Sequence, residues 1–331
     1  DATAVGSDAQ ATGAQSTALG DGTVASATDA TAVGQGADAL IADSVAVGAD
    51  AQATTGAGAT AVGDSATATA ADATAVGESA DAIAADATAL GSDAQAVGPQ
   101  STALGDASAA NGLNDTAVGQ AATVAAVNST AVGQGATIGT GADNSVAVGQ
   151  GATVGAGASN STVVGQAATA NAKFATVVGQ GAAANFQNSA AFGAGAQATA
   201  ENEQVFGTTA NTYTMPGITS SQSRGRQSGA LEVVTSDSQG HLATDGGLIF
   251  NKLEENTEGV AMALAMASAV PYLTENERFA FSGSWGTFEG ANSAAFGTRV
   301  RVVDFFSLAG GVGIGAEEGT VGGTLSARFA F

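Results

Sequence analysis

The stretch that decides the fold of this chain is Thr-Ala-Val-Gly, which first stands at Thr3–Gly6 and returns about every fourteen residues. The gaps between successive glycines of this repeat are mostly 14, once 15 and twice 16. Each unit of so short a repeat can bury its apolar face only against the next unit, so the period predicts a solenoid. The repeat glycines are Gly6, Gly20, Gly34, Gly48, Gly63, Gly77, Gly91, Gly105, Gly119, Gly133, Gly149, Gly165, Gly179, Gly193 and Gly207.

Within each repeat, the residues around the glycine alternate in character. The residue before glycine is large and apolar, the one before that is nearly always alanine, and the third is usually threonine. This period of two predicts a short strand with alanine on one face and threonine and valine on the other. A glycine turn then leads to Ala-x-Ala, as in Ala9–Ala11, which predicts a second short strand. We therefore expect a parallel β-roll over residues 1–210, with alanine in a narrow interior.

The large apolar residues before the glycines predict a stripe along the whole roll. An exposed stripe of this kind would be an extended apolar patch, and such patches favour association. We therefore expect the stripe to lie in the contact between identical chains. Its residues are Val5, Leu19, Val33, Val47, Val62, Val76, Leu90, Leu104, Val118 and Val132.

Two other interpretations of the repeat remain open with less weight. A column of threonines on a β-solenoid is typical of ice binding, but valine shares this face and each coil supplies one threonine. Calcium-binding β-rolls use Gly-Gly-x-Gly-x-Asp-x repeats. Here the aspartates shift their position from coil to coil, which argues against a ladder of ligands; examples are Asp8, Asp21, Asp29 and Asp38.

Composition and charge narrow the possible partners. The chain has 48 glycines and 5% aromatic residues, so a core at about 25 cal/mol per Å² is thin and further burial between chains is expected. The formal net charge is −22, and residues 1–172 contain no lysine or arginine. Such a surface repels phosphate groups, so no nucleic-acid partner is expected. The chain has no cysteine, which excludes disulfides and thiolate metal sites, and we expect no metal and no cofactor.

The start and the middle of the chain carry few signals. The sequence opens in mid-repeat at Asp1–Gly6 with no signal peptide, so we expect a processed or truncated N-terminus. Residues 211–246 are polar and predict a neck or connector with a hairpin near His241. His241 is the single histidine, and no nucleophile motif accompanies it, so an enzyme is not expected.

Residues 247–271 predict a short coiled-coil helix. Apolar or small residues recur at alternating steps of four and three, which indicates a coiled-coil seam, and Asn256 within it would fix the register. Val260–Val270 is apolar apart from Ser268, but eleven residues are too few to span a bilayer as a helix. The seam comprises Ile249, Leu253, Asn256, Val260, Ala263, Ala267 and Val270.

Residues 272–331 predict four strands, near 278–286, 293–303, 305–315 and 321–331. Each has aromatic or aliphatic residues on one face and polar or small residues on the other, which is typical of transmembrane β-barrels. A sheet of a soluble domain is the alternative. Four strands cannot close a barrel, and open edges are not viable in lipid.

Strand counting then sets the number of chains. Two chains would give eight strands around a filled interior, and three would give twelve strands with room for three helices. We therefore expect a trimer. The small residues Gly297, Gly311 and Gly313, with Asn256 of the helix, would line a lumen through which the rest of the chain passes.

The sequence closely resembles the trimeric autotransporter adhesins, with a YadA-like head and anchor. The head resemblance rests on the glycine repeats and on fuller Asn-Ser forms such as Asn128-Ser129 and Asn144-Ser145. The anchor resemblance rests on Gly259–Met266, Val270-Pro271, Phe279–Phe281, Trp285–Gly290 and the terminal Phe331.

This resemblance implies a trimeric left-handed parallel β-roll and a twelve-stranded barrel in the outer membrane of a Gram-negative bacterium, exported by type V secretion. It implies attachment to host extracellular matrix, host cells or surfaces, autoagglutination and a part in virulence. Its implied partners are two further copies, outer-membrane lipid, and the barrel-assembly machinery, which would read Phe329 and Phe331. The chain departs from longer relatives in having almost no stalk. A soluble trimeric fibre or spike, of phage or surface-layer type, is the alternative from another class.

Overall fold

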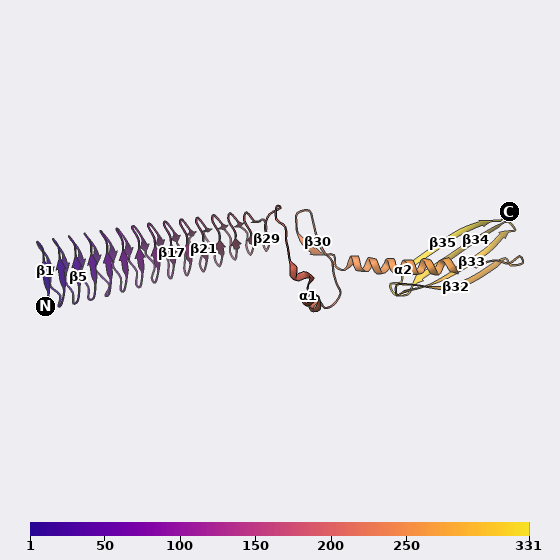
Figure 1. The fold of residues 1–331 in the computed structure, drawn as a ribbon, viewed down its shortest axis with the longest axis horizontal. Helices are drawn as coiled ribbons and strands as arrows, with labels where there is room; N and C mark the ends of the chain where they lie inside the picture. Colours follow the sequence, from indigo (N-terminus) through magenta and orange to yellow (C-terminus); the bar gives the residue numbers. More distant parts are fainter. Residues whose placement is uncertain (331) are drawn as a thin grey trace. The chain divides into compact units, whose positions relative to one another are not determined.

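The computed structural model describes residues 1–330, and the chain divides into two compact units, Asp1–Tyr213 and Thr214–Phe331. The first unit is a solenoid whose strands stack in chain order (Figure 1). Each coil contributes one strand to each of two parallel sheets, one of 15 strands and one of 14. Each coil needs only about fourteen residues because short turns connect its two strands. Each strand pairs in register with the matching strand of the next coil.

The 15-stranded sheet carries the Thr-Ala-Val segments. Its strands are β1 Thr3–Val5, β3 Thr17–Leu19, β5 Thr31–Val33, β7 Val45–Val47, β9 Thr60–Val62, β11 Thr74–Val76, β13 Thr88–Leu90, β15 Thr102–Leu104, β17 Thr116–Val118, β19 Thr130–Val132, β21 Val146–Val148, β23 Thr162–Val164, β25 Thr176–Val178, β27 Ala190–Phe192 and β29 Gln204–Phe206.

The 14-stranded sheet carries the second short segment of each coil. Its strands are β2 Gln10–Ala11, β4 Val24–Ala25, β6 Asp38–Ala39, β8 Gln52–Ala53, β10 Thr67–Ala68, β12 Asp81–Ala82, β14 Gln95–Ala96, β16 Ala109–Ala110, β18 Thr123–Val124, β20 Thr137–Ile138, β22 Thr153–Val154, β24 Thr169–Ala170, β26 Ala183–Ala184 and β28 Gln197–Ala198.

The core of the solenoid is a set of alanine columns between the two sheets. Ala61, Ala75 and Ala89 pair in register along β9, β11 and β13, and each is fully buried. The inner positions of the other sheet are filled in the same way, with Ile138 the largest fully buried side chain. A side chain with a single methyl group suits this interior because the two sheets of each coil lie close together.

Glycine and acidic or amide residues make the turns. The repeat glycine Gly77 has φ of 140°, a conformation that side chains strongly disfavour, and a Cβ there would overlap the backbone carbonyl of Gly91. Asp72 and Asn128 occupy the left-handed region, with φ of 54° and 56°, which aspartate and asparagine tolerate better than other residues. Of the shifting aspartates, Asp8, Asp21 and Asp29 are therefore turn residues, whereas Asp38 lies in strand β6.

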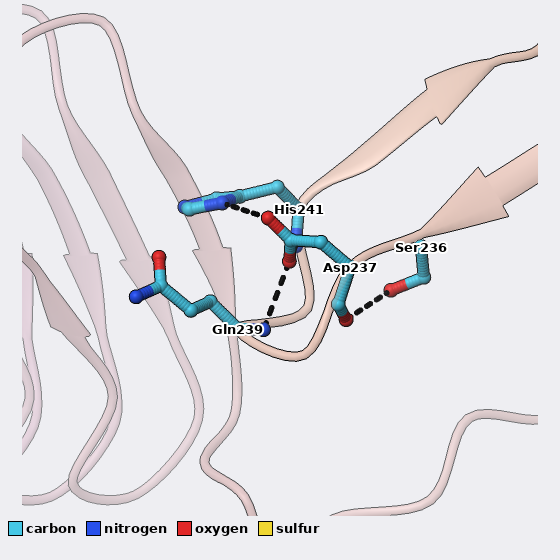
Figure 2. Close-up of polar contacts among 4 residues, drawn as sticks. All are labelled: Ser236, Asp237, Gln239 and His241. Carbon is cyan, nitrogen blue, oxygen red and sulfur yellow. Dashed lines mark hydrogen bonds and ion pairs between the residues drawn. The ribbon is translucent and has the colours of Figure 1, made fainter.

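The second unit begins with a polar connector. It contains the 3₁₀ turn η1 (Pro216–Thr219), helix α1 (Ser221–Arg226) and a hairpin of β30 (Val234–Ser236) and β31 (Leu242–Thr244). In the hairpin turn, Asp237 accepts hydrogen bonds from the backbone N–H groups of Gln239 and His241 and lies 2.9 Å from His241 Nδ1 (Figure 2). The His241 side chain and these N–H donors lower the pKa of Asp237. His241 is thus an exposed turn residue.

The rest of the second unit is a helix laid along an antiparallel sheet (Figure 1). The helix is α2 (Leu248–Ala269), and the strands are β32 (Phe279–Phe288), β33 (Ala291–Val303), β34 (Phe306–Gly315) and β35 (Val321–Phe329). They pair in chain order, and within residues 1–330 β32 and β35 are the edges. None of the helices that the structure describes is long and apolar enough to cross a membrane.

The expected fold class is confirmed for the single chain: a β-solenoid of about fifteen turns, one long helix and a four-stranded antiparallel sheet. The expected strands are found with bounds shifted by a few residues, chiefly because the turn before β33 is tighter than expected and the first two strands extend toward it. The association of three chains and the closure into a barrel remain predictions.

Candidate functional site

The outer face of the Thr-Ala-Val sheet is an apolar stripe. Each strand there points its alanine inward and its first and third residues outward, so the residue before each glycine lies on the surface. Val5, Leu19, Leu90 and Leu104 are exposed, and the other predicted positions are half-buried: Val33, Val47, Val62, Val76, Val118 and Val132. The structure therefore brings all ten predicted residues onto one face, and their place in a contact between chains stays a prediction.

The other sheet presents a different surface. Its outward positions are polar or small, as at Gln52, Asp81 and Gln95. The outward residues of the two sheets thus differ, with valine or leucine beside threonine on one and mainly polar or small residues on the other.

A ladder of side-chain amides runs along one corner of the solenoid, and the sequence interpretation missed it. The Nε2 of Gln134 donates to the Oε1 of Gln120 at 3.0 Å, and Gln150 donates to Gln134 at 2.9 Å. Gln166 and Gln180 continue the series. All occupy the position after the repeat glycine, so recurrence of Gly-Gln in five coils was a usable signal. Stacked glutamines of this kind stabilise in-register strands.

One coil replaces the small buried residue before its strand with an acid. Asp115 is fully buried and accepts hydrogen bonds from the backbone N–H groups of Gly112, Ala126 and Ser129 at 2.9–3.2 Å. Burial raises the pKa of Asp115, and the N–H donors oppose that rise. The group is a structural acceptor, and within the part of the chain that the structure describes, no cluster of three acids or histidines is placed to hold a metal ion.

The sheet β32–β35, which the sequence predicts to be an anchor and which is called the anchor sheet below, has small residues on the face that α2 covers. The hydroxyls of Ser282 and Ser284 donate to the carbonyls of Ala269 and Ala265 of α2. A Cβ at Gly297 would overlap the carbonyl of Ala269, and a Cβ at Gly313 would lie within 2.5–3.1 Å of the Met262 and Met266 side chains. Gly297 and Gly313 thus lie against α2, and their place in a lumen through which the chain passes stays a prediction.

The remaining predicted anchor residues differ in their surroundings. Gly311 pairs with Gly297 in register, but a Cβ there would meet Phe296 O and Thr324 Oγ1, not the helix. Asn256 is exposed, on the opposite side of α2 from the buried residues Ala261, Ala265 and Ala269. Phe329 is exposed and its ring lies 4.8 Å from that of Phe306. Phe331 lies outside the described residues.

The helix therefore has two faces with different roles. One face, built on Glu258, Ala261, Met262, Ala265 and Ala269, is buried against the chain's own sheet. The predicted coiled-coil seam is the other face, and its members Ile249, Leu253 and Val260 are exposed in the single chain. The coiled-coil seam stays a prediction, and sequence reasoning missed the buried face, whose small residues also recur every four positions.

The outer face of the anchor sheet is aromatic and aliphatic. Phe279, Phe281, Trp285, Phe296 and Leu325 are all exposed. Alternate positions of the same strands face the helix, as the expected alternation requires. A soluble sheet normally covers such a face with its own chain, and here no element in residues 1–330 packs over it.

The repeat itself identifies the solenoid. Six segments match the YadA head domain repeat, residues 1–23, 25–51, 55–80, 82–108, 110–136 and 156–182. The solenoid is thus built from YadA head domain repeats. The resemblance to YadA-like trimeric autotransporter adhesins is thereby confirmed, and an adhesin-like, structural protein is supported.

A solved structure is also similar to the chain. It is the crystal structure of the collagen-binding domain of the Yersinia adhesin YadA, 18% identical, with a TM-score of 0.18, and the match covers 74% of this chain and 87% of that one. No curated protein matches the chain. The family assignment rests on the repeat segments of the YadA-like head.

Proposed function

We propose that this chain is a bacterial surface adhesin whose C-terminal unit anchors and exports its own YadA-like head as a trimer in the outer membrane. The observation that carries the proposal is the two-sided anchor sheet. Its inner face holds serine, alanine and glycine against α2, and its outer face exposes aromatic and aliphatic side chains. An apolar outer face over a small, polar inner face suits a strand set between lipid and a filled lumen.

The two open edges of the sheet support the trimer. β32 and β35 each pair with one neighbour in the chain, and unpaired backbone groups at an edge are costly in lipid. Pairing β32 of one copy with β35 of the next, three times, gives a closed sheet of about twelve strands. The exposed seam of α2 would then meet the same seam of the other two helices in the lumen.

The head supplies the adhesive surface. The apolar stripe of the Thr-Ala-Val sheet would be covered by the other two heads, leaving the polar sheet and the turns toward host matrix, cells or surfaces. Family membership supports this arrangement, because YadA-like adhesins are homotrimeric outer-membrane surface proteins. We propose no catalytic activity for the chain.

Cell fractionation tests the anchor. The full-length chain, expressed in a Gram-negative host with a signal peptide, should appear in the outer-membrane fraction as a trimer that resists dodecyl sulfate until heated. Protease added to whole cells should remove the head and leave the anchor protected. A chain found in the soluble fraction as a trimer would instead support a fibre or spike. Binding of the displayed head to immobilised matrix proteins, against cells that lack it, tests adhesion.

A further inference from the structure

A buried carboxylate ties α2 to the turn between β34 and β35. Glu258 is 1% exposed, and its Oε1 accepts hydrogen bonds from the backbone N–H groups of Glu317 and Glu318 at 2.8 and 3.0 Å. Its Oε2 accepts from the Thr320 hydroxyl at 2.6 Å and from the Thr320 N–H at 3.4 Å. Four donors from one turn thus converge on a single carboxylate, which is the geometry of an anion-binding nest.

The surroundings of the carboxylate leave little freedom. A Cβ at Gly315 would overlap the Glu258 carboxyl group, so the glycine at the end of β34 makes the space in which the group sits. The hydroxyl of Ser293 donates to the Glu258 backbone carbonyl at 3.3 Å. A buried carboxylate without partners would destabilise the fold strongly, and these donors offset that cost only in this position.

The rest of the helix interface does not define its own register. Ala261, Ala265 and Ala269 recur every four residues against the small residues of the sheet, and Met262 and Met266 do the same beside Gly313. A slide of the helix by four residues, about 6 Å along its axis, would replace alanine with alanine and methionine with methionine at most contacts. Small apolar packing alone therefore distinguishes poorly between these two depths.

Glu258 makes these positions of the helix differ in energy. If the helix moved so that Glu254 entered the nest, Glu258 would stand at the place of Met262, where no donor is available among the described contacts. If it moved the other way, Met262 would enter the nest and leave four donors without an acceptor. Both slides carry a polar penalty that the alanine and methionine contacts do not.

We infer that the β34–β35 turn is a carboxylate-binding site whose ligand is the side chain of Glu258, and that this contact sets the depth at which α2 stops in the anchor. Buried polar groups that fix the register of packed helices are the best-attested use of such contacts. The inference rests on the proposed function and deepens it, because the depth of α2 would define where export of the head ends.

Paired cysteines in the full-length chain read the depth directly, since the chain has no cysteine of its own. Ser284 contacts the carbonyl of Ala265, so the pair Ala265→Cys with Ser284→Cys should react with a short thiol crosslinker. The pair Ala261→Cys with Ser284→Cys should stay at background. In a Glu258→Ala background the yields should exchange, because Glu254 can then enter the nest and only a methyl group is carried to the place of Met262.

Matched variants distinguish a change in the depth of α2 from a general loss of folding. Glu254→Gln alone should leave the wild-type crosslinks unchanged, because Glu254 is exposed. Adding Glu254→Gln to Glu258→Ala should abolish the preference for the new pair. Glu258→Met would carry a methionine to the place of Met262 and no carboxylate to the nest in the present position, so it should give the same exchange even if Glu258→Ala does not accumulate.

The outcomes are distinct. Unchanged 265–284 crosslinking in both Glu258→Ala and Glu258→Met, with no 261–284 product, would overturn the inference. The crosslinks are scored on the chain in whichever fraction it is found. If the chain is soluble and shows the expected exchange, the role of the carboxylate contact stands and the membrane anchor is rejected. If the chain is a membrane trimer without the exchange, the anchor stands and the role of the carboxylate contact is rejected.

Discussion

In the solenoid, alanines face other alanines of the same chain, and each coil completes the core of the one before it. In the anchor, alanines and glycines of one sheet face a single helix, and the aromatic side chains on the other face have no partner within residues 1–330. Small residues thus form a core that is closed within the chain in the first unit. In the second unit they pack one face of a sheet whose other face stays exposed. The difference indicates that a single chain suffices for the solenoid's interior, whereas one face of the anchor sheet stays uncovered in the single chain.

The largest expected effect tests whether the solenoid depends on its glycine column. Gly77→Ala places a Cβ against the Gly91 carbonyl at φ of 140°, so we expect a loss of roughly 3 kcal/mol or more from strain and overlap together. Gly135→Ala is the control, because φ there is 64° and nothing lies within 4 Å; it should cost about 1 kcal/mol. Hydrogen exchange of the flanking coils measures both, and equal effects would contradict a role for the close stacking.

A second expected effect separates two roles of the small residues in the anchor sheet: passage of the head through the lumen and packing against α2. Gly297→Val should displace Ala269 of the helix at a cost of about 1–3 kcal/mol, and head display on whole cells should fall more than the yield of heat-modifiable trimer. Gly310→Val, where the nearest atom is 3.4 Å away, should lower neither. Unchanged display of the Gly297→Val chain would refute the passage hypothesis.

A smaller effect is expected at the apolar stripe. We expect this surface to be covered by other chains, although the alanine core is buried within one chain. Leu90→Asp with Leu104→Asp alters side chains already exposed in the single chain, so coil stability should change by less than about 1 kcal/mol. The contact between chains should lose about 1–2 kcal/mol per site. Sedimentation of the detergent-extracted chain measures association. Gln95→Asp, on the opposite sheet between these two coils, is the control, and a trimer equally stable in both variants would place the contact elsewhere.

The smallest predicted effect concerns the one acid inside the solenoid. Because burial raises the pKa of Asp115, the folded chain holds this proton more tightly than the unfolded chain. The contribution of the protonated Asp115 carboxyl to folding stability is complete below its pKa in the unfolded chain, about 3.9. This contribution is lost as pH rises through the pKa of Asp115 in the folded chain. Melting curves from about pH 3 to 7 should show wild type losing stability relative to Asp115→Asn as pH rises. Asp93→Asn, in an exposed turn, controls for the loss of one charge, and parallel curves for all three chains would contradict the prediction.

Much of the fold was predictable because both units follow simple periods. The spacing of glycines such as Gly77 predicted the solenoid, and the period of two predicted its alanine interior and the outward stripe. In the anchor, alternation in segments such as 321–329 predicted which face carries Leu325. The amide ladder was not predicted although Gly-Gln recurs in successive coils, because a single glutamine after glycine reads as an ordinary turn residue until the coils are stacked in register. The buried Asp115 resembled the turn acids for the same reason.

The sequence by itself determined the solenoid and the two-sided strands, since each depends on contacts between residues at a fixed, short spacing. Only the tertiary structure decided which side of α2 lies on the sheet and where the helix stops along it. Ala261, Ala265 and Ala269 repeat every four residues and permit several depths. The choice among them is made by a contact between residues about 60 positions apart, the carboxylate of Glu258 and the turn at 317–320. Local periodicity carries no information about such a pairing.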